Sequence, residues 1–153
     1  DGGTITNGGG TVINTINYVA VGDVNGDHLN DLVIAFYANQ PESSVGIFLQ
    51  NALGTLNSMV KHPAHYTFPL PIEIADVSGD GLKDVVVLHG YDANSGVGLF
   101  QQLPNGTLSQ VESISPIPIS SLGQMVIGDI NGDGKNDIAI ASGVYGLVVL
   151  YHY

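Results

Sequence analysis

The nine-residue stretch Asp129-Ile-Asn-Gly-Asp-Gly-Lys-Asn-Asp137 decides the fold, because the chain carries three copies of it. The other two copies are Asp23-Val-Asn-Gly-Asp-His-Leu-Asn-Asp31 and Asp76-Val-Ser-Gly-Asp-Gly-Leu-Lys-Asp84. They start at residues 23, 76 and 129, so the repeat period is 53 residues. A fixed period of this size is typical of a repeat architecture. The sequence therefore predicts one structural unit used three times.

Short apolar stretches flank each copy and predict a strand on either side of a tight loop. These stretches are 18–21 and 32–36, 72–75 and 85–88, and 125–127 and 138–141. A third strand is expected at 45–50, 97–102 and 145–150, and a turn with a fourth strand at 53–56 and 105–108. The third copy ends at Tyr153 before this last segment, whereas Asp1-Gly-Gly-Thr-Ile5 has its pattern. We therefore expect the terminal repeat to be split between the N-terminus and the C-terminus.

The predicted fold class is all-β. No window shows sustained helical periodicity, and the prolines lie in the predicted connections. Four-stranded units of about 40 to 50 residues, rich in β-branched residues and glycine turns, are typical of β-propeller blades. The sequence thus predicts a single unit over residues 1–153, made of three four-stranded antiparallel propeller blades.

Composition excludes several classes of function. The formal net charge is -11, with 14 Asp and Glu against three Lys and no Arg, so neither nucleic acid nor anionic lipid is an expected partner. The chain has no cysteine, which rules out disulfides and zinc-thiolate sites. No apolar run approaches the roughly 18 residues of a membrane span, so membrane insertion is not expected.

The three loops have the donor types of a calcium site. Oxygen-bearing side chains stand at positions 1, 3, 5 and 9, and glycine stands at position 4. Calcium takes six to eight oxygen ligands, and alternate residues of a tightly coiled loop point inward, while position 7 offers its carbonyl. We expect up to three calcium ions. The predicted side-chain ligands are Asp23, Asn25, Asp27, Asp31, Asp76, Ser78, Asp80, Asp84, Asp129, Asn131, Asp133 and Asp137, with backbone oxygens of Leu29, Leu82 and Lys135.

Two other interpretations of the loops are weaker. Hairpin turns alone would explain the glycines, but not carboxylates whose mutual repulsion costs stability unless a cation neutralises them. An EF-hand needs Glu at position 12, where this chain has Ile34, Val87 or Ile140 in a predicted strand. The first loop is the least typical copy. His28 stands at its position 6, where a positive φ angle is expected.

At these residues the chain resembles the FG-GAP/VCBS repeat family, the calcium-loop blades of integrin α-subunit propellers, fungal propeller lectins and many bacterial secreted proteins. The resemblance rests on the three Asp loops and on the Gly-Leu-Phe and Asn-Gly-Thr-Leu patterns that follow them. It implies a secreted or cell-surface protein, whose calcium loops join strands one and two on one face. It also implies that ligands meet the opposite face or the clefts between blades. Three blades fall short of a closed ring, since propellers have at least about four.

Candidate ligand-binding residues lie in the connections predicted to oppose the calcium loops. Aromatic rings beside Asn and Asp suit sugar rings, which need stacking and hydrogen-bonding partners. The candidates are Tyr37, Tyr66, Tyr91, Asp92 and Asn94, and Tyr145 lies in a similar connection.

No catalytic motif appears, so an enzyme is not expected. The sequence has no Gly-x-Ser-x-Gly elbow, phosphate loop or His-Glu-x-x-His motif. Three functions stay open. The first is a calcium-stabilised extracellular binding or adhesion module with a glycan or protein ligand. The second is a structural subunit that forms homo-oligomers by strand or blade complementation. The third is an accessory fragment of a larger secreted propeller protein.

Overall fold

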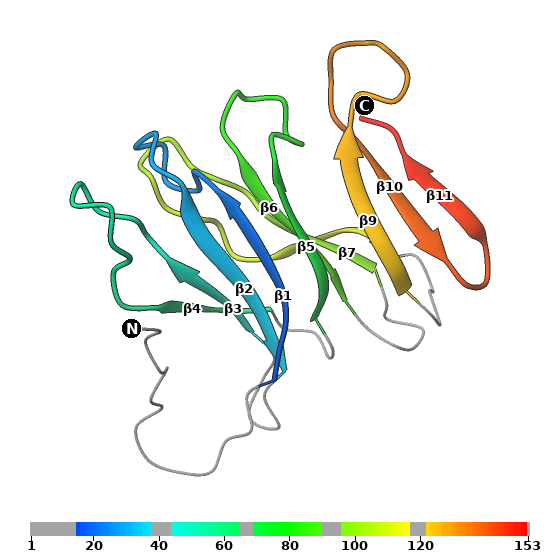
Figure 1. Ribbon diagram of the computed structural model, residues 1–153. Coiled ribbons are helices and arrows are strands. Elements are labelled where there is room, and N and C mark those ends of the chain that lie inside the picture. The colour runs from blue at the N-terminus through cyan, green and yellow to red at the C-terminus, as the bar shows by residue number, and fades with distance from the viewer. Residues whose placement is uncertain (1–14, 38–43, 65–68, 90–95, 117–121, 153) are drawn as a thin grey trace.

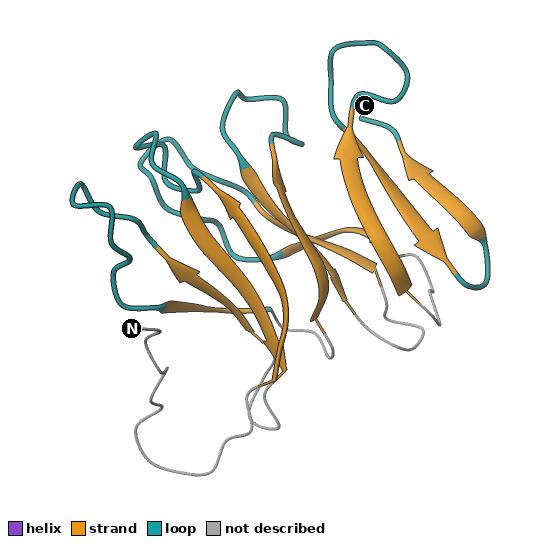
Figure 2. Cartoon of the chain, in the orientation of Figure 1, coloured by secondary structure: helices purple, strands orange, loops and turns teal. Residues whose placement is uncertain are grey.

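A computed structural model describes residues 15–37, 44–64, 69–89, 96–116 and 122–152. These residues form eleven strands joined by loops and turns, with no helix among them (Figure 2). The expected all-β class is confirmed. In the same residues there is accordingly no long apolar helix of the kind that crosses a membrane.

The strands form three antiparallel sheets, each with its strands in chain order. The first sheet contains β1 (Thr15–Gly22), β2 (Asp31–Tyr37), β3 (Ser44–Phe48) and β4 (Val60–Pro63). The second contains β5 (Pro69–Ala75), β6 (Asp84–His89), β7 (Gly96–Phe100) and β8 (Glu112–Pro116). The third contains β9 (Leu122–Gly128), β10 (Asp137–Ser142) and β11 (Gly146–Leu150). We call these sheets, with their loops, repeats one, two and three.

The three sheets stand face to face in an open row (Figure 1). The first strand of each repeat contacts the first strand of the next, so that β1 lies beside β5 and β5 beside β9. Among the described residues the row does not close into a ring.

The apolar core lies between neighbouring sheets and consists of two clusters. Strand β6 contributes to both, because successive side chains of a strand point to opposite faces. Val85 and Val87 pack toward repeat one, while Val86 and Leu88 pack toward repeat three, and all four side chains are fully buried. Both faces of β6 are therefore covered, and repeat two lies between repeats one and three.

The expected turns at 53–56 and 105–108 are confirmed, and repeats one and two do have a fourth strand, but β4 and β8 lie further along the chain than expected. Each segment is a tight turn, in which Gly54 and Gly106 have φ angles of 74° and 78°. This backbone conformation suits glycine and reverses the chain instead of extending a ladder. Leu56 and Leu108 make only isolated bridges, and β4 and β8 begin four residues after them.

This correction weakens the expected split of the terminal repeat. The pattern shared by residues 1–5 and the two Gly-Thr segments is that of a turn rather than a strand. Residues 1–14 lie outside the described part of the chain, and repeat three has three described strands. The exchange of an N-terminal strand stays a prediction without support from this pattern.

The third strand of repeat three is confirmed, but its expected alignment is displaced by two residues. Leu150 pairs with Ile138 as Phe100 pairs with Val85 in repeat two. Val148 therefore stands where the other repeats have glycine. The displacement arises because β10 and β11 are joined by a short turn, closed by the pair of Ser142 and Gly146.

Candidate functional site

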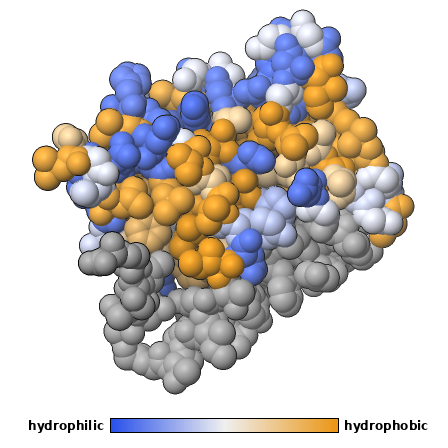
Figure 3. Space-filling view, viewed as in Figure 1, coloured by the Kyte–Doolittle hydropathy of each residue, from blue (hydrophilic) through white to orange (hydrophobic). Residues whose placement is uncertain are grey.

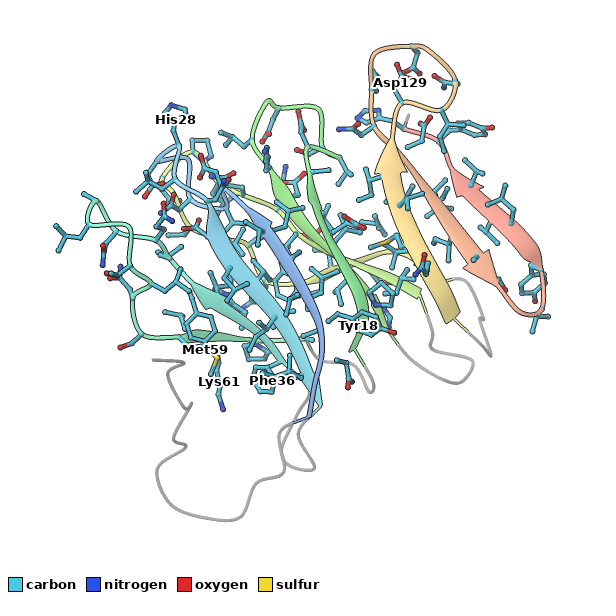
Figure 4. All side chains as sticks on the ribbon, in the orientation of Figure 1. Tyr18, His28, Phe36, Met59, Lys61 and Asp129 are labelled. Carbon is cyan, nitrogen blue, oxygen red and sulfur yellow. The ribbon has the colours of Figure 1, made fainter. Side chains whose placement is uncertain are left out.

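The three Asp loops, residues 23–31, 76–84 and 129–137, lie at one edge of the row of sheets. Each joins the first and second strands of its repeat. In Figure 4, His28 marks the first loop and Asp129 the third, both at the top of the view. The predicted ligands therefore gather in three separate groups, one for each repeat.

Position 1 of each loop holds the coil together. Its carboxylate accepts hydrogen bonds from the backbone N–H groups of positions 4 and 6. The donor–acceptor distances are 2.6 and 2.8 Å to Asp23, 2.7 and 2.9 Å to Asp76, and 2.6 and 2.9 Å to Asp129. Burial raises the pKa of Asp23, but hydrogen bonds from four backbone N–H groups outweigh this effect and hold the pKa below its ordinary value.

Position 6 has the positive φ angle that the sequence predicts. The angle is 88° at Gly81, 85° at Gly134 and 66° at His28. His28 is the one non-glycine residue with positive φ in the described part of the chain. The first loop thus keeps the backbone path of the other two, at the cost of an unfavourable conformation for histidine.

Position 5 binds the backbone of its own loop as well. Its carboxylate accepts a hydrogen bond from the N–H of position 7, at 2.8 Å in Asp27, 2.8 Å in Asp80 and 2.9 Å in Asp133. In the first and third loops the position 3 amide, from Asn25 or Asn131, also donates to this carboxylate at 3.0 Å. The amide of Asn131 is the main cause that lowers the pKa of Asp133.

Position 9 has a structural role that the sequence did not reveal. Asp31, Asp84 and Asp137 are fully buried. Each accepts one hydrogen bond from the N–H of position 2, at 3.0 to 3.1 Å, and another from an N–H that follows the third strand, at 2.8 to 3.0 Å. The strand-end donors are Gln50, Gln102 and His152. This carboxylate therefore ties each Asp loop to the end of the third strand.

Burial has an electrostatic cost at position 9 of the first two loops. It raises the pKa of both Asp31 and Asp84, because the charged carboxylate loses contact with water. For Asp31, the negative charges of Asp27 and Asp23 raise the pKa further. The three carboxylates of one loop thus repel one another.

The donor types fit calcium, although the described residues hold no preformed cage. No three carboxylate or imidazole groups among them lie close enough together to hold a metal ion. Each loop nevertheless offers carboxylate, amide or hydroxyl, and backbone carbonyl oxygens within nine residues, which are the ligands that calcium prefers. Among the described residues of the loops, one imidazole lies near a carboxylate: Nδ1 of exposed His28 is 3.8 Å from Oδ2 of Asp23. Cation binding would require the carboxylates at positions 1 and 5 to converge on position 9.

A comparison with protein families gives a match that includes the three Asp loops. The profile of the FG-GAP-like repeat covers residues 23–87 and, a second time, 76–140, which together make up more than half of the chain. The chain belongs to the FG-GAP-like repeat family. Each match begins at position 1 of an Asp loop and ends within the next repeat. A comparison with curated proteins gives no match.

The edge opposite the Asp loops carries part of the predicted ligand site of these FG-GAP-like repeats. Tyr37 ends β2 at this edge, where it pairs with Thr15. Tyr145 lies exposed in the turn between β10 and β11. The other predicted residues lie outside the described part of the chain, namely Tyr66, Tyr91, Asp92 and Asn94. Their grouping into one site stays a prediction.

Sequence reasoning missed a cleft between the second and third FG-GAP-like repeats. It has a volume of about 450 Å³ and lies beside the second Asp loop. Apolar side chains such as Leu99, Ile138 and Leu150 line it, together with polar Ser78 and Asn136. A cleft with apolar walls and a few polar groups suits a small ligand. Its walls come from two repeats, so no local sequence pattern marks it.

Proposed function

We propose that the chain is a calcium-stabilised, secreted binding module. One observation carries this proposal: three Asp loops, in repeats of the FG-GAP-like family, have the same hydrogen-bonded arrangement of carboxylates at positions 1, 5 and 9. Nine of the 14 acidic residues are concentrated in these loops. Such a concentration of like charge destabilises the fold unless cations neutralise it.

The residues of each loop have distinct tasks in this proposal. Positions 1 and 5 hold the coil by accepting backbone N–H groups, and their exposed edges face solvent. Position 9 reaches beneath the coil to the end of the third strand. Calcium bound at these oxygens would supply charge neutralisation and a cross-link within the loop. Since all three tasks recur in every repeat, stabilisation is expected at three points along one edge.

The three sheets are, in our proposal, blades of a β-propeller. The face-to-face packing of successive antiparallel sheets and the adjacency of β1, β5 and β9 support this arrangement. The ligand would then bind at the edge away from the Asp loops. The connections at this edge differ among the copies while the strands agree, which is where a scaffold varies without loss of its fold.

Carbohydrate is the ligand class that we propose for that edge, because its tyrosines offer rings for stacking. A glycan array tests this part separately. Alanine at Tyr91 should weaken glycan binding and leave calcium-dependent melting unchanged. A protein that binds no glycan on the array would contradict the ligand class but not the calcium proposal.

Titration calorimetry on protein stripped with a chelator tests the calcium proposal. We expect three bound ions, with dissociation constants near the 10⁻⁴ to 10⁻³ M range that is roughly typical of extracellular modules. Asp80→Ala and Asp133→Ala should each lose one ion. Glu112→Ala, which removes an exposed acidic group of β8 outside the loops, should keep all three. Absence of calcium binding in this range would overturn the proposal.

A further inference from the structure

The two interfaces between repeats use the same loop contact. The side chain that follows the third strand reaches the Asp loop of the preceding repeat. Nε2 of Gln102 lies 3.2 Å from the point that a Cβ atom would occupy on Gly26, and Nε2 of His152 lies 3.1 Å from the same point on Gly79. Both glycines are position 4 of their loops. The contact is therefore a property of the repeat and not of one pair of residues.

Among the described residues, the receiving half of this contact is open at one end of the row, and the counterpart of the inserting side chain stands at the other end. Gly132 is position 4 of the third loop, and no atom of the described residues lies within 4 Å of its Cβ point. Gln50 follows the third strand in repeat one, as Gln102 does in repeat two. Repeat three thus presents the receiving half of the interface, and repeat one presents the inserting half.

The turn after the third strand shows the same relation. In repeat two, the Cβ point of Gly106 lies 2.8 Å from the backbone oxygen of Asn25 in the first Asp loop. In repeat one, Gly54 occupies the equivalent turn position, and its Cβ point meets nothing within 4 Å in the described part of the chain. Asn131 is the residue of the third loop that corresponds to Asn25. The turn at Gly106 therefore contacts the Asp loop of the preceding repeat, whereas the turn at Gly54 has no preceding Asp loop beside it among the described residues.

The first strands give a third, independent match. Cγ2 of Ile74 lies 2.8 Å from the Cβ point of Gly22, so the two strands approach closely between repeats one and two. The corresponding residues at the ends of the row are Val21 and Gly128. The Cβ point of Gly128 meets no described atom within 4 Å, and Val21 is 65% exposed.

Apolar side chains are exposed on both end faces where their counterparts are buried. On repeat one, Val19 is 62% exposed, whereas the equivalent Ile72 is 5% exposed. On repeat three, Ile130 is 49% exposed, whereas the equivalent Val24 is 2% exposed. The space-filling view shows apolar residues gathered on the side of the molecule where β1 lies (Figure 3). Exposed apolar patches of this kind mark interaction surfaces.

Not all of the repeat one face is open. Ile34 and Phe36 belong to the same face and are already buried. Lys61 covers Phe36, with its Nζ 5.2 Å from the ring centroid (Figure 4). The open part is therefore the half nearer the Asp loops, where the contacts described above would form.

We propose that a second copy of the chain docks head to tail, with its repeat one seated on repeat three of the first copy. The two end faces are the two halves of an interface that the chain already forms twice, so they are complementary by construction. Gln50 of one copy would lie against Gly132 of the other, and Val21 against Gly128. The proposal does not depend on bound calcium, because apolar side chains, one amide side chain and backbone atoms make these contacts.

Analytical ultracentrifugation of the 153-residue chain tests this proposal, with calcium and with chelator in separate runs. We expect a mass of at least twice 15.9 kDa in both runs. Val21→Asp should reduce the mass to 15.9 kDa. Val144→Asp, a matched substitution of an exposed valine in the turn between β10 and β11, should keep the wild-type mass. A monomeric wild-type chain would overturn the proposal and would favour a further repeat of a longer polypeptide as the occupant.

A disulfide experiment tests the register of docking, because the chain has no cysteine. Val21→Cys and Gly128→Cys variants are mixed under oxidising conditions, after circular dichroism has confirmed that both fold. The intrachain pair Gly22→Cys and Ile74→Cys is the reference, since its Cβ positions lie 3.3 Å apart, near the span of a disulfide. We expect a mixed dimer that is lost when Val144→Cys replaces Val21→Cys. Formation of the reference bond without the mixed dimer would contradict the register.

Discussion

His28 and Gly81 hold the same position in two copies of the Asp loop, with φ angles of 66° and 88°. Both donate their backbone N–H to the position 1 carboxylate, at 2.8 and 2.9 Å. This hydrogen bond forms in all three loops. Histidine therefore adopts a conformation that disfavours residues with a Cβ atom, at a cost of about 1 to 2 kcal/mol. The first loop carries strain that the other two lack.

Replacing His28 with glycine should stabilise the protein. Relief of the strain exceeds the added entropy of the unfolded chain, so we expect a gain of about 1 kcal/mol in the free energy of unfolding. Urea denaturation measures this gain. The reverse change, Gly81→His, is the matched control and should cost a similar amount. If His28→Gly lowers stability, the imidazole makes a contribution that outweighs its strain.

Calcium-dependent stability should differ between the loops for the same reason. Asp80→Ala and Asp133→Ala should each remove more of the calcium-dependent gain in melting temperature than Asp27→Ala. The strained first loop is expected to bind its ion more weakly, so less stabilisation is lost with it. Differential scanning calorimetry with and without calcium gives the comparison. Equal losses in the three variants would show that His28 does not weaken its loop.

Loss of the position 9 carboxylate should be costly even without calcium. Asp84→Ala leaves the backbone N–H groups of Val77, Ser78 and Gln102 without their acceptor. We expect a loss of about 2 to 4 kcal/mol, since an unsatisfied buried donor costs about 1 to 3 kcal/mol. Chemical denaturation in chelator measures the loss. Asp80→Ala, at an exposed position of the same loop, should cost much less under the same conditions, and equal costs would contradict a structural role for position 9.

His89 should make a contribution to stability that is lost as the solution is acidified from pH 6.5 to pH 4. Burial lowers the pKa of this histidine to about 4, from an ordinary value of 6.5. The folded state holds the neutral form while the unfolded chain takes up a proton, so the contribution is intact above pH 6.5 and is lost as the pH falls toward 4. Through this group alone, the free energy of unfolding should fall by about 3 kcal/mol between pH 6.5 and pH 4.

His89→Phe separates this contribution from other titrations. Phe36 occupies the equivalent position in repeat one, so the replacement suits the fold. Burial also lowers the pKa of His62, and the slope should therefore be reduced rather than abolished. Urea denaturation between pH 4 and pH 7, in chelator, measures the slope. A slope that His89→Phe leaves unchanged would show that His89 is not the responsible group.

The sequence predicted the repeats, the first three strands and the Asp loops because each has a local signal. Apolar residues recur on both sides of every loop, and glycine marks positions that need positive φ. The fourth strands have no such signal. The residues of β4 at Val60–Pro63 are mostly exposed and include both apolar and basic side chains. A prediction from the sequence therefore places the start of the fourth strand at the nearby Gly-Thr turn.

The role of position 9 was hidden for a different reason. Its strand-end donors are backbone N–H groups 15 to 19 residues further along the chain. A backbone N–H can come from almost any residue type, so both Gln50 and His152 act as the strand-end donor. A carboxylate that binds backbone and one that binds calcium look the same in a sequence. Only the fold shows that the carboxylates of Asp31, Asp84 and Asp137 bind backbone N–H groups.

The melting temperature of the chain as calcium is added and then chelated tests the central claim most directly. Ions that bind the folded loops and not the unfolded chain raise stability by mass action. We predict that the melting temperature rises with calcium, falls again with chelator, and responds far less in a variant that combines Asp27→Ala, Asp80→Ala and Asp133→Ala. A melting temperature that is unchanged by calcium and by chelator would contradict the account.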